Sequence, residues 1–220
     1  MITDFGLKSP DPTDTMSTRL NTFLLLLTIL VTSISAETAA ARQAGEDQAI
    51  RVMLEQREAD IKQLLGNDEE LSDAQMDALR AAVNDMFDFD SMGREALGRH
   101  WNEITADQQQ EFVEVFAEIV RYQSLADVDI YRANVTYEEI TVSGDDAQVI
   151  TTTVYKEVPT VVEYALRRSG EDWLATDVVL DEVSTVEGYS RSFQSYVRKW
   201  GFDALMENLN KRLERNQSES

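Results

Sequence analysis

The chain has 220 residues, of which 43% are hydrophobic and 28% are charged, and its formal net charge at pH 7 is −21. This composition indicates a folded domain with a hydrophobic core and excludes a disordered or largely membrane-embedded chain. The acidic excess excludes a protein that neutralises phosphates and predicts repulsion from anionic membranes, so we expect no nucleic acid partner and no stable membrane insertion. Since cysteine is absent, disulfides and thiolate metal sites are excluded.

The N-terminal part of the chain has the pattern of a secretory signal peptide. Arg19 precedes an apolar run over residues 23–31, and small residues follow it to Ala36. The run is shorter than the roughly 20 residues that a spanning helix needs, so a permanent anchor is the weaker alternative. Residues 1–15 are too acidic for such a signal. We therefore expect upstream residues and a signal peptide over 1–36, with translation starting at Met16, and a spacer over 37–45.

Helical spacing of apolar residues dominates the chain from the end of this spacer to residue 131. It predicts four helices, over residues 46–66, 71–87, 88–98 and 105–131. Ser72 and Thr105 stand at the N-caps of the second and fourth helices, and Gln108 follows Thr105 as in a capping box. The fourth helix carries an apolar stripe of Phe112, Val115, Phe116, Ile119, Val120 and Tyr122.

Residues 134–183 are rich in Val, Thr, Ile and Tyr, and turn signals at residues 143–145, Pro159 and residues 169–171 divide them into four antiparallel strands. We expect two sets of side chains to face an apolar layer made by the fourth helix and the helix that contains Tyr189. These sets are Val162, Tyr164 and Leu166 on one strand, and Ile150, Thr152 and Val154 on its neighbour.

The pattern returns to helix after residue 184, where Gly201 divides a long helix from a shorter amphipathic one, and a polar tail follows over 216–220. Helices, then a meander of strands, then helices predict an α+β fold. In this fold the helices pack on one face of a curved antiparallel sheet of about four strands.

The residues offer little for catalysis. His100 is the single histidine of the chain, which excludes a catalytic triad and a two-histidine metal site. Neighbouring acids such as Glu138 and Glu139 are expected to be solvated surface. The chain also lacks a glycine-flanked nucleophilic serine and a phosphate-binding glycine loop. We therefore predict that the protein is not an enzyme and has no catalytic residues, no metal site and no cofactor.

Two segments of the chain resemble the MlaC family, also called the toluene-tolerance auxiliary family. The first segment matches the family pattern at Phe87, Asp88, Phe89, Met92, Arg94, Leu97, Gly98, Trp101, Gln108, Phe112 and Phe116. The second matches it at Gly170, Trp173, Asp177, Val178, Ser184, Tyr189, Arg191 and Phe193. The second segment departs from the pattern at Glu182, where the family usually has glycine, and at Ser190, which separates Tyr189 from Arg191.

The resemblance covers roughly residues 46–215 and implies an MlaC-like lipid-binding domain. Such a protein is a periplasmic carrier without enzymatic activity. It moves phospholipid between an outer-membrane lipoprotein complex and an inner-membrane ABC transporter with its substrate-binding partner, which maintains the lipid asymmetry of the outer membrane. The lipid tails lie in an apolar cavity between sheet and helices. We expect the lipid-binding residues to be Val115, Ile119, Tyr122, Val154, Tyr164, Leu166, Val178, Tyr189 and Phe193.

The residues themselves leave an alternative open, because an ordinary packed core produces the same apolar pattern. The rival is an acidic periplasmic adaptor with a solid core and no lipid ligand. If the protein is a carrier, we expect Phe87, Phe89 and Trp101 to fix the short third helix between its neighbours as a structural brace rather than to contact the lipid directly. Arg94 could face a phosphate or form an ion pair with an acidic side chain, and we favour the ion pair.

Overall fold

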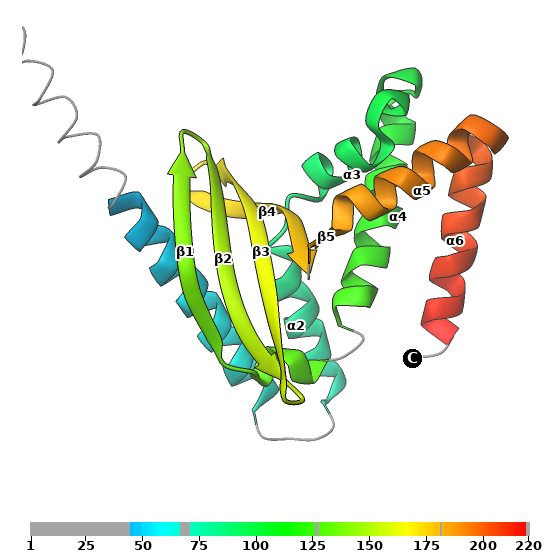
Figure 1. Cartoon of the computed structure of the whole chain (residues 1–220). Coiled ribbons are helices and arrows are strands. Elements are labelled where there is room, and N and C mark those ends of the chain that lie inside the picture. Colours follow the sequence, from blue (N-terminus) through cyan, green and yellow to red (C-terminus); the bar gives the residue numbers. More distant parts are fainter. Residues whose placement is uncertain (1–44, 67–70, 126–127, 181, 219–220) are drawn as a thin grey trace, which may run out of the picture. The chain divides into compact units, whose positions relative to one another are not determined.

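The computed structural model of the chain describes residues 45–66, 71–125, 128–180 and 182–218 (Figure 1). The elements below belong to one compact unit, Asp47–Ser220, except for the first two residues of the helix over residues 45–65. The predicted upstream residues, the signal peptide, the start at Met16 and nearly all of the spacer lie outside the described residues. In the described ranges, no helix is long and apolar enough to cross a membrane.

The part of the chain that the structure describes contains six α-helices. They are a first helix over residues 45–65, α2 (Asp73–Asn84), α3 (Phe89–Leu97), α4 (Ala106–Ser124), α5 (Thr185–Trp200) and α6 (Phe202–Ser218). Two 3₁₀ helices, η1 (Gly98–Glu103) and η2 (Val128–Arg132), follow α3 and α4. The predicted N-caps are confirmed, because the Ser72 and Thr105 side chains accept hydrogen bonds from the backbone N–H groups of Gln75 and Gln108.

The predicted fourth helix is too long. The helix α4 ends at Ser124, and the segment that follows forms η2 instead of continuing to residue 131. Tyr131 lies in η2 and packs against a small cluster of Ile61, Leu65 and Leu79, and its hydroxyl donates to the Ser124 carbonyl at 2.9 Å. Burial of this aromatic ring against the first helix and α2 therefore outweighs the local helical pattern.

The strands form one antiparallel sheet in the order β1-β2-β3-β4-β5, so each strand pairs with the next along the chain. They are β1 (Val135–Ser143), β2 (Asp146–Tyr155), β3 (Val158–Ser169), β4 (Asp172–Leu180) and β5 (Val183–Ser184). The first four are the predicted strands, and β5 is a two-residue addition that pairs with the end of β4. The α+β fold class is confirmed, with helices packed against the sheet.

The turn predicted at Pro159 lies earlier in the chain. Lys156 and Glu157 form the β2–β3 turn, and Pro159 stands inside β3 opposite Val154. The strand β4 reaches only as far as Val162 along β3. The missing N–H of Pro159 therefore falls on a stretch of β3 without a neighbour on that side, where proline is tolerated.

The inward face assigned to β2 is wrong. Thr151 and Val149 lie opposite Val162 and Tyr164, so the odd-numbered residues of β2 face inward. Ile150, Thr152 and Val154 occupy the other face, and Val154 is 57% exposed. A shift of one residue moves every side chain of a strand to the opposite face. The sequence did not indicate this register, because a threonine in a strand is expected on the surface unless its hydroxyl is known to have a hydrogen-bond partner.

The layer that covers the sheet is also different from the predicted one. Ile50 and Leu54 of the first helix pack against inward side chains of the sheet, including Val149, Leu166 and Trp173. The helices α3 to α6 instead form a separate cluster around Phe112, Phe116, Ile119 and Phe193. The prediction that the fourth helix and the Tyr189 helix form this layer is therefore incomplete, because the first helix packs directly on the sheet while the apolar stripes of α4 and α5 pack mainly on each other.

Arg57 ties the first helix to the sheet. Its guanidinium donates to the carbonyl of Trp173 at 3.0 Å and to both carboxylate oxygens of Asp172 at 2.9 Å. A bidentate Arg–carboxylate pair fixes orientation as well as distance. The helix is therefore held at the start of β4 as well as by its apolar stripe.

The segment 87–101 connects the two main clusters. Phe87 packs against both of them, and the backbones of Met86 and Asp88 pair with Ala175 of β4 at 2.8 and 2.9 Å. This packing agrees with the predicted brace. The guanidinium of Arg94 lies 5.5 Å from the centre of the Trp101 ring. The expected ion pair of Arg94 does not occur among the contacts of the described residues.

Candidate functional site

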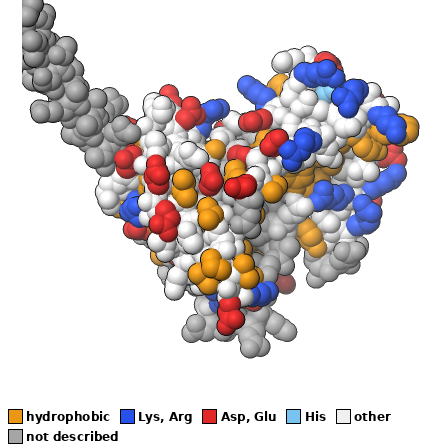
Figure 2. Space-filling model, in the orientation of Figure 1, with side chains coloured by type: hydrophobic (Ala, Val, Ile, Leu, Met, Phe, Trp, Pro, Cys, Tyr) orange, Lys and Arg blue, Asp and Glu red, His pale blue; other side chains and the backbone are white. Residues whose placement is uncertain are grey.

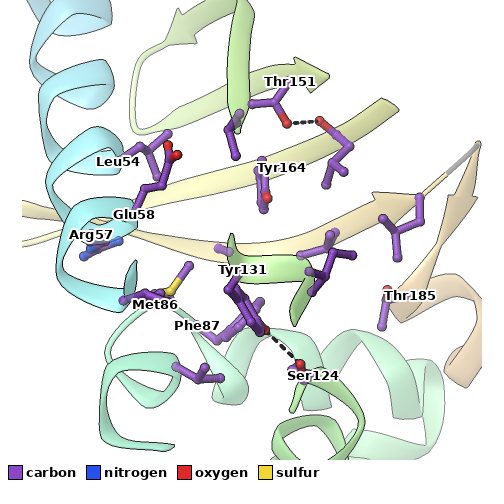
Figure 3. A pocket seen from close by; sticks show the side chains of 18 of the residues that line it. Leu54, Arg57, Glu58, Met86, Phe87, Ser124, Tyr131, Thr151, Tyr164 and Thr185 are labelled. Atoms are coloured by element: carbon purple, nitrogen blue, oxygen red, sulfur yellow. Dashed lines mark hydrogen bonds between the residues drawn. The ribbon is translucent and has the colours of Figure 1, made fainter. Parts of the chain in front are cut away.

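A cavity of about 500 Å³ lies where the three hydrophobic clusters meet (Figure 3). Met92 and Val120 reach it from the helical cluster. Leu166 reaches it from the cluster between the first helix and the sheet, and Ile61 from the cluster around Leu79. The cavity is therefore the space that these three packed groups leave between them.

Strands and helices supply opposite walls of the cavity. The inward side chains of β2, β3 and β4 form one wall, including Thr151, Tyr164 and Val178. Leu54 of the first helix and Met86 after α2 contribute to the other side, and Figure 3 shows side chains from both directions converging. The wall is mostly aliphatic, so the space suits an apolar ligand.

The polar groups of the wall are largely satisfied by the protein itself. The Tyr137 hydroxyl donates to a carboxylate oxygen of Glu58 at 3.3 Å, and Glu58 is paired with Lys62 at 2.7 Å. The Thr151 hydroxyl donates to the Val162 carbonyl at 3.0 Å. Since a satisfied polar group adds little polarity to a wall, these residues leave the cavity essentially apolar.

The tyrosines that line the cavity stay neutral at physiological pH. Burial raises the pKa of Tyr131 to about 12, with a smaller contribution from Tyr164. Burial, followed by the nearby carboxylate of Glu58, also raises the pKa of Tyr137 and of Tyr164. Loss of a phenol proton would leave a charge in an apolar space, which is unfavourable.

The other titratable groups do not form a recognisable catalytic or metal arrangement. His100 is buried away from the cavity lining, with Nδ1 2.5 Å from a carboxylate oxygen of Glu103. No cluster of three or more potential metal ligands occurs in the described ranges. The arrangement at the cavity can therefore hold an apolar molecule.

The structure brings three of the nine expected lipid-binding residues to the cavity, namely Tyr164, Leu166 and Val178. The other six residues lie elsewhere. Ile119 and Phe193 are buried in the helical cluster, and Val115 and Tyr189 pack against it. Tyr122 is half-buried on α4 without lining the cavity, and Val154 points away from it.

Sequence reasoning missed the contribution of the first helix and of the segments after α2 and α4. Leu54, Ile61, Met86, Phe87 and Tyr131 all line the cavity. The apolar stripe of the first helix was a usable signal, since an amphipathic helix must cover some apolar surface. The sequence did not show that this surface was the inward face of the sheet.

The fold and the site together define a class of protein, a mixed α and β domain with an apolar cavity between a sheet and its helices. The chain belongs to the MlaC family, because the family model described as MlaC protein matches residues 55–211. That family comprises non-enzymatic lipid-binding carriers.

Solved structures support the same fold. Seven chains match, and one is a phospholipid-binding protein from Ralstonia solanacearum in complex with a phospholipid. It is 20% identical to this chain with a TM-score of 0.64, and the match covers 78% of this chain and 98% of that chain. No curated protein matches the chain significantly.

The departure from the family pattern at Glu182 has a backbone explanation. Glu182 has a φ of 66°, in the left-handed region that glycine adopts without steric strain. The backbone at this position therefore keeps the conformation that a glycine would favour, although the side chain is a glutamate.

Proposed function

We propose that this protein is a periplasmic phospholipid carrier that holds an acyl chain in the cavity. It takes lipid from, or gives lipid to, an outer-membrane lipoprotein complex and an inner-membrane ABC transporter with its substrate-binding partner, and so maintains outer-membrane lipid asymmetry. The observation that carries the proposal is the apolar cavity between the sheet and the helices. Membership of the MlaC family and the lipid-bound Ralstonia protein support it.

The size of the cavity suits one acyl chain. An apolar cavity of about 150 Å³ takes up benzene, which corresponds to roughly 25 Å³ per carbon atom. At that ratio the volume of about 500 Å³ accommodates about 20 carbon atoms. This estimate matches a single long hydrocarbon chain and far exceeds a packing defect in an ordinary core.

The energetics suit transfer in either direction. Burying each methylene away from water is worth about 0.8 kcal/mol, so a chain of about 16 methylenes gains about 13 kcal/mol. A bilayer provides nearly the same gain, because its interior is also free of water. The difference between bilayer and cavity is therefore small, and the partner proteins can set the direction of transport.

The rival function, an acidic adaptor with a solid core, accounts less well for the interior. A solid core has few voids larger than a water molecule. The observed cavity is much larger than that and is lined by aliphatic side chains. A ligand that fills the cavity explains why so large an apolar space is present.

A cavity-filling substitution tests the proposal. Val178 is half-buried, lines the cavity and belongs to none of the three buried clusters. We expect Val178→Trp to place its indole in the space of the ligand and to lower the lipid that co-purifies with the protein at least tenfold, with the thermal melt retained. Native mass spectrometry measures the occupancy and calorimetry measures the melt. Ile150→Trp is the matched control, since Ile150 is also half-buried but lies on the outer face of the same sheet.

Two results would contradict the carrier. One is a wild-type protein that carries no lipid after gentle purification and takes none from phospholipid vesicles. The other is a Val178→Trp protein that carries as much lipid as the control, because a filled cavity cannot hold an acyl chain.

A further inference from the structure

Exposed apolar side chains are concentrated at one end of the sheet. Seven large hydrophobic residues of the described ranges are exposed, and five of them lie near the β2–β3 turn or the β4–β5 turn. These five are Val154 (57%), Val158 (60%), Val161 (45%), Leu180 (44%) and Val183 (59%). Both turns lie at the same end, because β3 and β4 are antiparallel and Val162 stands opposite Leu180.

The same two turns contain the strained backbone. Among the described residues, only three other than glycine have a positive φ: Lys156 at 48°, Glu157 at 66° and Glu182 at 66°. Each stands in a turn at this end of the sheet. Exposed apolar surface and non-glycine residues with a positive φ are both unfavourable for the protein without a partner. Their coincidence at one end of the sheet therefore indicates a functional surface.

The apolar residues occupy both faces of the sheet end. Val154 and Val161 belong to the outer face, whereas Leu180 and Val183 pair with each other on the face that bears Val162. The β2–β3 hairpin also extends beyond the end of β4 (Figure 1). A flat protein partner covers one face, whereas an apolar medium surrounds both faces of a projecting hairpin.

This surface is continuous with the cavity. Leu180 lines the cavity and is also 44% exposed, and Val162 and Thr153 line it from the base of the β2–β3 hairpin. In the view of Figure 2, hydrophobic side chains gather at the end of the sheet where Figure 1 places this hairpin. An acyl chain could therefore pass from the surface to the cavity along apolar side chains.

The charges select the kind of lipid surface. Lys156 and Glu157 at the tip of the hairpin cancel each other, whereas Glu182, next to Val183, adds a negative charge and the chain as a whole has a formal charge of −21. An anionic membrane would repel the protein, and a zwitterionic surface would not. Tyr155, beside Lys156, is a residue type that favours the interface between membrane and water.

We propose that this end of the sheet makes a shallow, transient contact with a zwitterionic phospholipid surface. The contact surface consists of the β2–β3 hairpin together with Leu180 and Val183 at the facing ends of β4 and β5, and it presents the cavity to the lipid. The inference rests on the proposed function only for the idea that the contact delivers a lipid to the cavity.

Vesicle binding tests this contact. In the full chain, a fourfold Val→Thr variant at Val154, Val158, Val161 and Val183 keeps the β-branched shape of each side chain while replacing a methyl group by a hydroxyl. We expect its partition coefficient onto phosphatidylcholine vesicles to fall about tenfold, because four partly buried methyl groups are lost. The matched control is Val52→Thr, since Val52 is 54% exposed on the first helix. Co-flotation measures the binding, and circular dichroism checks the fold.

The lipid content of each variant separates the contact from the proposed function. A fourfold variant that keeps its bound lipid but loses vesicle binding supports the contact. Wild-type protein that carries no lipid but binds vesicles through these valines also supports the contact and refutes the carrier. Equal vesicle binding by the wild type and the fourfold variant would overturn the contact surface, as would an equal loss in the Val52→Thr control. Failure of the wild-type protein to bind these vesicles would also overturn the proposed contact.

Discussion

The left-handed conformation of Glu182 predicts a stabilising substitution. A side chain in this region costs about 1–2 kcal/mol, and glycine removes that strain. Glycine also loses more backbone entropy on folding, which offsets about 0.5–1 kcal/mol. We therefore expect Glu182→Gly to raise the free energy of unfolding by about 0.5–1 kcal/mol, measured by urea denaturation.

The matched control for this substitution is Glu171→Gly. Glu171 is an exposed glutamate in the β3–β4 turn, and its φ is not positive. The control should lose about 0.5–1 kcal/mol of stability, because only the entropic penalty applies. If Glu182→Gly is destabilised as much as the control, the backbone at Glu182 is not strained.

The raised pKa of Tyr131 predicts how the free energy of unfolding changes with pH in the alkaline range. Burial raises the pKa of this tyrosine to about 12 in the folded protein, from an ordinary value near 10. The folded state therefore holds the phenol proton more tightly than the unfolded state does. Its contribution is fully present below pH 10 and is lost as the pH rises from about 10 to 12, by up to about 2–3 kcal/mol.

Replacing the phenol isolates this contribution. In Tyr131→Phe the free energy of unfolding should depend less on pH between pH 10 and 12, although the hydrogen bond to the Ser124 carbonyl is also lost. Urea denaturation at a series of alkaline pH values measures the difference. Equal slopes for the two proteins would show that Tyr131 titrates normally in the folded state.

We expect the ring of Phe87, in the connection between α2 and α3, to hold the helical cluster and the cluster between the first helix and the sheet together. Phe87 packs against both main clusters, whereas Phe89 packs only against the helical one. Phe→Ala at a buried site costs about 3–5 kcal/mol, so we expect about 2 kcal/mol for the half-buried Phe87. Amide hydrogen exchange should then accelerate in both β4 and α3.

Phe89→Ala is the control for this prediction, and it should accelerate exchange in the helices while leaving β4 protected. Phe87 also lines the cavity, so Phe87→Ala should change lipid occupancy where Phe89→Ala does not. Identical exchange patterns for the two variants would mean that the segment does not act as a brace.

Several elements could be predicted because their signals are local. The N-caps at Ser72 and Thr105 and the alternation in β3 each arise within a few residues. The end of α4 and the inward face of β2 were predicted wrongly, since each depends on distant partners. Tyr131 packs on the first helix, and Thr151 lies opposite Val162. The intrinsic structural propensity of a segment contains no information about its contacts with residues that are distant in the sequence.

The charge of the protein predicts how it meets its proposed partners. A formal charge of −21 should steer it toward basic surfaces on the transporter side and on the outer-membrane side. Screening acts over about 8 Å at physiological salt, so the association rate should fall steeply as ionic strength rises. Stopped-flow measurements of complex formation at increasing salt check this expectation.

Vesicle binding provides the contrast. The contact proposed for the sheet end is apolar, so its binding to phosphatidylcholine should change little over the same range of salt. A partner association rate that does not depend on salt would show that the acidic surface serves solubility alone.

The α+β class, the acidic surface and the family resemblance followed from composition, periodicity and the spacing of motifs, all of which are properties of the chain before it folds. The resemblance also implied a cavity between sheet and helices, but most of the residues that line this cavity did not follow from the sequence. Its lining joins Leu54, Phe87, Tyr131 and Tyr164, which are far apart in the sequence and belong to different elements. An apolar residue has the same pattern whether it fills a core or lines a void. The separation between packed layers distinguishes the two cases, and that separation exists only once the first helix covers the sheet and the helical cluster closes on itself.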